Sequence, residues 1–432
     1  MQKSPETTVA SHAEPGDASL SRRMLIGAGA AATVGLAATA AHAQSLQTTT
    51  LGKSNASAAD LGPRNKALEA LNPDAYMAPP TDHGTVQQFW QSFSQAHRRI
   101  QDGGWARQVN VKDFPISTEI ASVNMKLNAG GVRELHWHEA DEWSLMLAGS
   151  ARLTAIDYDG HPYVKDVKAG DLWYFPQGIP HSIQGLGPDG CEFLLVFDQG
   201  KFSEDDTTLL TDWLIHTPPE VVGKNFGVGQ NALDPLKAIP PEGRYIFQAP
   251  VPPAIGDDIA AMTQASPATS TAFDFALLDM KPTKEDASGS IRIVDSRTFK
   301  ISKNIAAAYV VVKPGALREL HWHTNVAEWQ YYISGQGRMT LFANKSDSRT
   351  IDFRASDVGY VPVTLPHYIE NTGDEDLIYL EMFKSATYDD ISLNNWLAGL
   401  PPELVQQHLG LTKETMAAIP KTNLGVVGGK KG

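Results

Sequence analysis

Short apolar runs rich in aromatic and β-branched residues follow one another along most of the chain after residue 85, separated by Gly, Pro and Asp. Clear examples are Glu192–Phe197, Ala308–Val312 and Leu377–Phe383. Runs of this kind at intervals of about 8–12 residues predict an all-β barrel or sandwich. Helical patterns are confined to Val86–Gln101 and to two later stretches, which lie around Leu209–Ile215 and Leu400–Leu409.

The strand pattern occurs twice. The hexapeptide R-E-L-H-W-H occupies residues 133–138 and again 318–323, and further segments match in the same order: 170–176 with 356–362, 180–181 with 366–367, and 213–220 with 396–403. A duplication of this length predicts two homologous β units. We expect them at 85–248 and 271–432, joined by a Pro- and Ser/Thr/Ala-rich linker at 249–270.

The residues before the first unit have a different character. Residues 1–43 contain a polar start, the pair Arg22-Arg23, a Gly/Ala-rich apolar run and the small-x-small sequence Ala41-His42-Ala43. They resemble a twin-arginine export signal, which predicts a periplasmic or secreted protein; an uncleaved N-terminal anchor is the alternative. Residues 44–84 lack periodicity and predict a disordered linker or a loosely docked arm. No later run reaches the roughly 18 apolar residues of a membrane span, so we expect no membrane association after cleavage.

The amino-acid composition excludes several classes of function and of metal site. The 432 residues include 36 basic and 49 acidic side chains, a formal net charge of −13, which argues against a nucleic-acid or anionic-membrane binder. The single cysteine, Cys191, excludes an intrachain disulfide and a cysteine-based metal cluster. With only 13 histidines in the chain, their spacing is informative.

Histidines and a glutamate recur at matching positions in both units. Because residues i and i+2 of a strand share a face, the two histidines of each H-W-H motif point the same way. A glutamate follows each motif, and a third histidine follows a proline further on. The sets are His136, His138, Glu142 and His181, and His321, His323, Glu328 and His367. Glu328, unlike Glu142, breaks the parity of its motif, which predicts an extra turn or bulge residue. Three imidazoles and a carboxylate predict a divalent first-row metal, and the carboxylate favours Mn or Fe over Ni, Cu or Zn.

These motifs carry a resemblance to a known family. Residues 85 to 410 are similar to the bicupin oxalate decarboxylases through G-G-V-R-E-L-H-W-H, G-D-L-W-Y-F-P-Q-G-I-P-H-S-I-Q, E-F-L-L-V-F-D, T-D-W-L-I-H-T-P and E-N-T-G-D-E. The resemblance implies two jelly-roll β-barrels with short flanking helices, two Mn ions per chain held by the two His/Glu sets, and a hexamer. It also implies that oxalate is converted to formate and CO2, with dioxygen needed for turnover.

An arginine stands three residues before the first histidine of each motif, Arg133 in the first unit and Arg318 in the second. Because this offset is odd, the strand must bend for the arginine to reach the metal. The resemblance implies that Arg133 binds oxalate and stabilises developing charge. A rim arginine that holds a carboxylate is the alternative.

The two units differ after their last long strand. The interval from Phe197 to Trp213 is three residues longer than the one from Phe383 to Trp396, and it contains F-S-E-D-D-T at 202–207. The resemblance implies that this segment is an active-site lid and that Glu204 protonates the formate radical anion left when CO2 departs.

The lid departs from the family's Ser-Glu-Asn-Ser/Thr form at Asp205 and Asp206, which leaves the balance between decarboxylation and oxidation open. The second unit has no counterpart of Glu204; its candidates are Glu381 and Tyr388. We therefore expect turnover at the N-terminal site and a structural or electron-transfer role for the other. Two alternatives remain, an oxalate oxidase producing CO2 and hydrogen peroxide, and a non-enzymatic metal-binding cupin.

Overall fold

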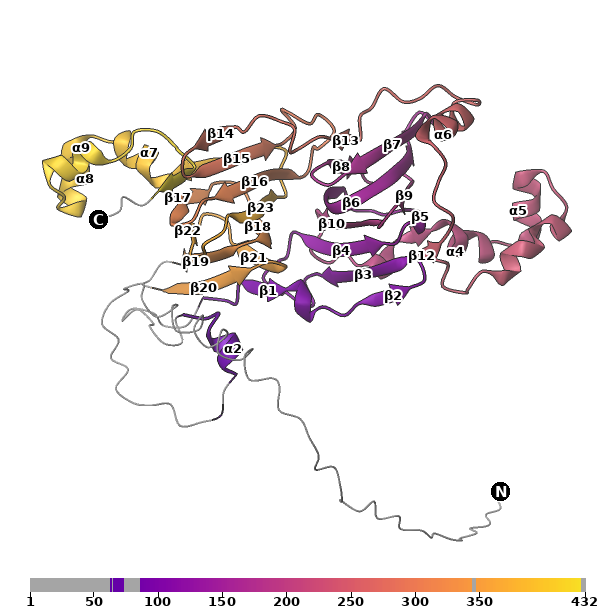
Figure 1. Cartoon of the computed structure of the whole chain (residues 1–432), viewed down its shortest axis with the longest axis horizontal. Coiled ribbons are helices and arrows are strands. Elements are labelled where there is room, and N and C mark those ends of the chain that lie inside the picture. The colour runs from indigo at the N-terminus through magenta and orange to yellow at the C-terminus, as the bar shows by residue number, and fades with distance from the viewer. Residues whose placement is uncertain (1–62, 64, 74–85, 344–346, 429–432) are drawn as a thin grey trace, which may run out of the picture. The chain divides into compact units, whose positions relative to one another are not determined.

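The computed structural model describes residues 63, 65–73, 86–343 and 347–428 (Figure 1). The predicted export signal at 1–43 lies outside these residues. In the part of the chain that is described, no helix has the length and apolar character needed to cross a membrane.

The described chain is dominated by antiparallel strands in two units, which confirms the all-β bicupin prediction. The sheet of the first unit contains twelve strands: β2 (Arg99–Gln101), β3 (Gly104–Val109), β4 (Ala121–Leu127), β5 (Gly131–Trp137), β6 (Glu142–Ile156), β7 (Pro162–Lys168), β8 (Leu172–Phe175), β9 (His181–Gly185), β10 (Cys191–Phe197), β11 (Thr208–Leu209), β12 (Ile246–Gln248) and β13 (Asp274–Phe275).

The second unit is built from two sheets. The seven-stranded sheet contains β1 (Trp90–Ser92), β14 (Lys284–Asp286), β15 (Gly289–Val294), β16 (Ala306–Val312), β18 (Glu328–Ser334), β21 (Asp357–Val361) and β23 (Leu377–Phe383). The six-stranded sheet contains β17 (Ala316–His323), β19 (Gln336–Phe342), β20 (Ser348–Arg354), β22 (His367–Asn371), β24 (Asp390–Ser392) and β25 (Val426–Gly428). The predicted runs at 192–197, 308–312 and 377–383 lie within β10, β16 and β23.

The first strand after each predicted boundary joins the sheet of the other unit. Strand β1 pairs with β21 of the second unit, and β13 pairs with β8 of the first. Phe89 and Phe93, which flank β1, are fully buried and contact Phe353 and Tyr331 of the second unit. The boundaries at 85 and 271 therefore mark the repeat in the sequence but not the division between the sheets.

The helix predicted over Val86–Gln101 is wrong. The segment consists of β1, the 3-10 turn η2 (Phe93–Gln95) and β2. Phe89 and Phe93 have the four-residue spacing of a helical stripe, but pairing of β1 with β21 satisfies the backbone instead. Tertiary pairing here overrides a local pattern.

Helices follow each barrel, as predicted around 209–215 and 400–409. They are α4 (Leu210–Ile215), α5 (Pro219–Phe226) and the 3-10 helix η4 (Gln230–Ala238) after the first, and α7 (Leu393–Ala398), α8 (Pro402–Leu409) and α9 (Lys413–Ala418) after the second. Helices α5 and α8 share their end signals, a proline at the first position and a left-handed glycine, Gly227 or Gly410, at the end.

Two segments predicted as linkers contain helices. Helix α6 (Ile255–Met262) lies within 249–270, and Arg152 Nη1 fixes it by donating to Asp258 Oδ2 at 2.6 Å and to the Pro253 carbonyl at 2.9 Å. Helix α2 (Lys66–Glu69) lies within 44–84, and the nearby Leu71 carbonyl accepts a hydrogen bond from Asp352 N on β20. Over the described residues 65–73 the structure therefore fits a docked arm, the second alternative given for 44–84, better than a disordered linker.

Candidate metal centres and active site

The predicted ligands of each unit converge from three strands, which belong to one sheet in the first unit and to both sheets in the second. In the first centre His136 lies on β5, His138 directly follows it, and Glu142 and His181 begin β6 and β9. The second centre repeats this on β17, β18 and β22 with His321, His323, Glu328 and His367. All eight side chains are buried, and within each set the ligand atoms lie within 4.8 Å of one another. The chain therefore contains two four-residue sites that fit two metal ions.

A loop accommodates the difference in parity between the two glutamates. Glu142 and Glu328 each open a new strand rather than continue the strand of the H-W-H motif. The connection runs through residues 139–141 in the first unit and 324–327 in the second, so the extra turn residue predicted before Glu328 is present in this loop.

Backbone carbonyls fix the tautomer of every histidine in the two centres. Each Nδ1 lies 2.6–3.1 Å from a main-chain oxygen: Glu134 for His136, Ala140 for His138, Ile179 for His181, Glu319 for His321, Asp389 for His323 and Leu365 for His367. A carbonyl can only accept, so Nδ1 carries the proton. In the neutral ring Nε2 then presents its lone pair to the centre, as in metal-binding histidines.

The protonation states of the ligands, and a buried carboxylate oxygen without a hydrogen bond, also fit a cation bound in each centre. Burial, followed by the Arg133 charge, lowers the pKa of His136 well below its usual value, so the ring stays neutral. Burial alone would raise the pKa of Glu142, but His138 and His181 outweigh it and lower that pKa, so the carboxyl is ionised. In the second centre the buried Glu328 Oε2 lies 2.8–3.1 Å from two imidazole Nε2 atoms without forming a hydrogen bond among the described residues. Lone pairs crowded in this way are expected around a metal ion.

A bulge brings the arginine and the histidines to the same side of the strand. The pairing of β5 with β9 shifts register between Arg133 and His136, and the pairing of β17 with β22 shifts between Arg318 and His321. The bend required by the odd offset is therefore present in both units. Arg133 is 1% exposed and Arg318 is fully buried.

In the first unit Arg133 binds the predicted lid. Its Nη2 lies 2.9 Å from Glu204 Oε2, and the carboxylate is itself 8% exposed. Glu204 begins the 3-10 turn η3 (Glu204–Asp206), and its backbone N–H donates to Gln108 Oε1 at 3.0 Å. Phe202 stacks on Phe197 and meets the ring of His138 edge to face. The segment therefore covers the first centre and places an acid beside its arginine.

In the second unit Arg318 is fixed by three side chains and by the Gly425 carbonyl, which accepts from its Nη1 at 3.1 Å. It donates to Glu381 Oε1 at 3.1 Å, to Asp390 Oδ2 at 2.7 Å and to the Tyr388 hydroxyl at 2.7 Å. Tyr388 in turn donates to Glu381 Oε2 at 3.0 Å, and burial raises the pKa of the tyrosine well above its usual value. Both candidates named for this unit are therefore partners of Arg318.

Two residues of these sites were missing from the sequence prediction. Asp390 stands where the first unit has Thr207, because Ile391 pairs with Trp322 as Thr208 pairs with Trp137. Tyr245 packs against Arg133, with the guanidinium carbon 4.3 Å from the ring centroid. Aligning the two halves residue by residue could have found Asp390; no local signal marks Tyr245.

The chain is similar to known proteins over most of its length. It matches the Cupin family at residues 91–234 and 275–417. It is 50% identical over 365 residues to oxalate decarboxylase OxdC of Bacillus subtilis (strain 168), covering 84% of this chain and 93% of that protein. It is 37% identical over 370 residues to a probable oxalate decarboxylase of Arthroderma benhamiae, covering 85% and 90%.

Solved structures agree with the sequence matches. The oxalate decarboxylase of Bacillus subtilis at pH 4.6 superposes with a TM-score of 0.82 at 49% identity, over 86% of this chain and 96% of that one. A structure of the same protein, from a study of its Mn(II) centres, matches with the same TM-score and identity. The chain therefore belongs to the cupin family, as a two-domain member of the oxalate decarboxylases.

Proposed function

We propose that the protein converts oxalate to formate and CO2 at the first centre, with Mn at both centres and dioxygen needed for turnover. The observation that carries this proposal is the Arg133–Glu204 pair, which places an acid on the lid directly beside an anion-binding guanidinium. The names of the relatives and the study of Mn(II) centres in one of them support the substrate and the metal.

Each residue has a defined part in this reaction. Bound Mn would supply Lewis-acid and redox chemistry at the first centre, held by His136, His138, Glu142 and His181. Arg133 binds a carboxylate of oxalate once Glu204 has released it. Glu204, once freed from Arg133, takes up a proton from solvent; when the C–C bond breaks and CO2 leaves, the remaining carbon takes this proton, so that formate is the product and Glu204 is again a carboxylate. The closed lid keeps water from competing for that step.

The second centre is a poor oxalate site on electrostatic grounds. Arg318 already faces two buried carboxylates, Glu381 and Asp390, where Arg133 faces only Glu204. A dianion arriving at Arg318 would have to displace groups that lie on the fixed strands β23 and β24. We therefore assign this centre a structural or electron-transfer role.

The lid also favours a second activity. The exposed Asp206 adds negative charge to a segment that must close for protonation, and an open lid would leave the intermediate that has lost CO2 without its acid. Oxalate, dioxygen and two protons would then give two CO2 and one hydrogen peroxide.

One experiment separates these activities. Purified, Mn-loaded protein is incubated with oxalate in air, and formate and peroxide are both quantified. Formate in large excess supports the decarboxylase, and peroxide without formate would replace it with the oxidase. Absence of both products would leave a non-enzymatic metal-binding cupin.

We also infer that the protein is exported through its twin-arginine segment and forms a homo-oligomer, a hexamer by family resemblance. The helices that follow each barrel leave large apolar side chains exposed, among them Trp213, Phe226 and Trp396. Light scattering on the purified protein measures the oligomer, and fractionation of cells that express the full chain measures export.

A further inference from the structure

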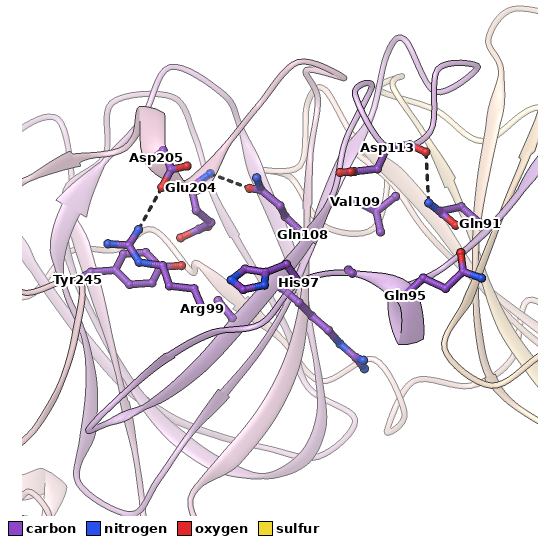
Figure 2. Close-up of a pocket in the computed structure, with 13 residues that line it drawn as sticks. Gln91, Gln95, His97, Arg99, Gln108, Val109, Asp113, Glu204, Asp205 and Tyr245 are labelled. Carbon is purple, nitrogen blue, oxygen red and sulfur yellow. Dashed lines mark hydrogen bonds and ion pairs between the residues drawn. The ribbon is translucent and has the colours of Figure 1, made fainter. Parts of the chain in front are cut away.

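The lid has a second attachment beside the Glu204–Arg133 pair. Asp205 Oδ1 lies 3.1 Å from Arg99 Nη1, and Arg99 belongs to β2 at the edge of the first sheet. Figure 2 shows this ion pair next to Glu204 and Gln108. Two consecutive lid carboxylates thus bind two different arginines.

Tyr245 connects these two arginines. The guanidinium carbons of Arg99 and Arg133 lie 3.8 Å and 4.3 Å from the centroid of its ring, which is 1% exposed. Tyr245 has a φ of 55°, a left-handed conformation that bulky residues rarely adopt. Glu134 Oε2 holds this backbone by accepting from Tyr245 N at 2.9 Å. Strain maintained in this way is typical of functional positions.

The second unit lacks this arrangement at the equivalent positions. Lys284 pairs with Ile291 on β14 and β15 as Arg99 pairs with Ala106 on β2 and β3. Gly425 accepts from Glu319 N as Tyr245 accepts from Glu134 N. Gly425 shares the left-handed φ, at 79°, and a Cβ there would meet Ile291 Cδ1 at 2.6 Å. The arginine–tyrosine–arginine contact thus occurs in the half that carries the lid.

We propose that Arg99 is a positioning residue for the reaction. Supported by Tyr245, it holds Asp205 and thereby keeps Glu204 over the first centre. This inference rests on the proposed function and goes beyond it, because it assigns the closed state of the lid to an ion pair at a residue outside the centre.

Arg99 is also placed to meet the substrate. It lines a cavity of about 480 Å³ together with His97, Arg107, Gln108 and the two lid carboxylates (Figure 2). An oxalate dianion that enters this cavity meets Arg99 and competes with Asp205 for it. A substrate anion bound at Arg99 therefore weakens this second attachment of the lid.

The strength of the pair suits such a role. The side chains of Arg99 and Asp205 are 33% and 76% exposed, so solvent and salt weaken their attraction. An exposed pair shifts an equilibrium by only about two- to five-fold. A contact of this strength biases the lid toward closure and still opens at every turnover.

The test compares Arg99→Gln and Asp205→Asn with the matched control Arg98→Gln, whose guanidinium lies over Trp105 instead. Hydrogen–deuterium exchange of residues 202–207 is measured in Mn-loaded protein without substrate, and the ratio of peroxide to formate is measured with oxalate. We expect both to rise about two- to five-fold in the first two variants and to stay at wild-type values in the control. The thermal midpoint of each variant shows that its fold is retained.

A charge swap and a salt series complete the test. Arg99→Asp combined with Asp205→Arg should restore slow lid exchange, and raising ionic strength should speed lid exchange in the wild type but not in Asp205→Asn. Lid exchange unchanged in Arg99→Gln would overturn the proposal, even if formate is produced normally. If wild-type protein makes no formate, the proposed function fails, whereas lid exchange still decides the role of Arg99.

Discussion

The arginine before the metal-binding histidines has different partners in the two units. Arg133 pairs with one carboxylate, Glu204, on a short 3-10 turn between strands, whereas Arg318 pairs with Glu381 and Asp390 on two strands and with Tyr388 between them. The metal ligands themselves are the same in type, order and burial. What distinguishes the two centres is therefore the number of groups around the arginine and whether they lie on a short turn or on strands.

The same difference separates two uses of a buried ion pair. A buried arginine satisfied by several fixed groups stabilises a local structure and leaves no place for a ligand. A buried arginine whose single carboxylate partner lies on a lid can exchange that carboxylate for an anion. Under the proposed function, the first centre is therefore suited to turnover and the second to holding a metal.

The largest expected effect is the loss of formate production when the lid acid of the first centre is removed. Glu204→Ala removes the proton donor, and loss of a positioned general acid typically lowers a rate by about 10²–10⁴-fold. Formate production should fall by that factor, Mn content should stay unchanged, and peroxide per oxalate consumed should rise. Product analysis and elemental analysis measure these quantities. Nearly normal formate in Glu204→Ala, with its loss in Glu381→Ala, would assign catalysis to the second centre.

Metal content tests the ligand assignment. His136→Ala with His138→Ala should remove about one of the two metal ions per chain, because two imidazoles of one centre are lost. His321→Ala with His323→Ala is the matched variant and should remove the other. Elemental analysis of both double variants checks this, and full retention of metal by either one would contradict its site.

The free energy of unfolding should depend more on Glu381 than on Glu204, which is the reverse of the order expected for activity. Glu381→Ala breaks a fully buried pair with Arg318, and such losses cost about 3–5 kcal/mol. We expect the lower end of that range, since Asp390 still pairs with the arginine. Chemical denaturation measures the free energy of unfolding. A smaller loss in Glu381→Ala than in Glu204→Ala would remove the distinction between a fixed and an exchangeable partner.

The smallest expected effect is a pH dependence of the free energy of unfolding, caused by the pair of Asp390 with Arg318. Arg318 and Lys284 outweigh burial and lower the pKa of Asp390 to about 2. Because the folded pKa lies below the ordinary value of about 4, Asp390 stabilises the fold above pH 4, and this contribution disappears as the pH falls through about 2. It is on the order of 2 kcal/mol. Asp390→Asn should therefore flatten the stability profile between pH 4 and 2, whereas a profile identical to the wild type would contradict the pairing.

The sequence by itself determined the duplication, the strand-rich character and both ligand sets. These depend on local rules: alternation places the histidines of H-W-H on one face, and repeated motifs identify equivalent positions in the two units. The bend between Arg133 and His136 also followed from parity. The helical segments after each barrel carried a helical pattern that the structure bears out.

Only the tertiary structure decided which partner each of these residues meets. The exchange of β1 and β13 between units, and the strand at 90–92 where a helix was predicted, depend on pairing with residues far away in the sequence. The contacts of Arg318 with Asp390, and of Tyr245 with Arg99 and Arg133, also join distant segments. Local periodicity identifies the side chains that face a centre, but long-range packing decides which charges meet there, and in this protein those charges distinguish the two sites.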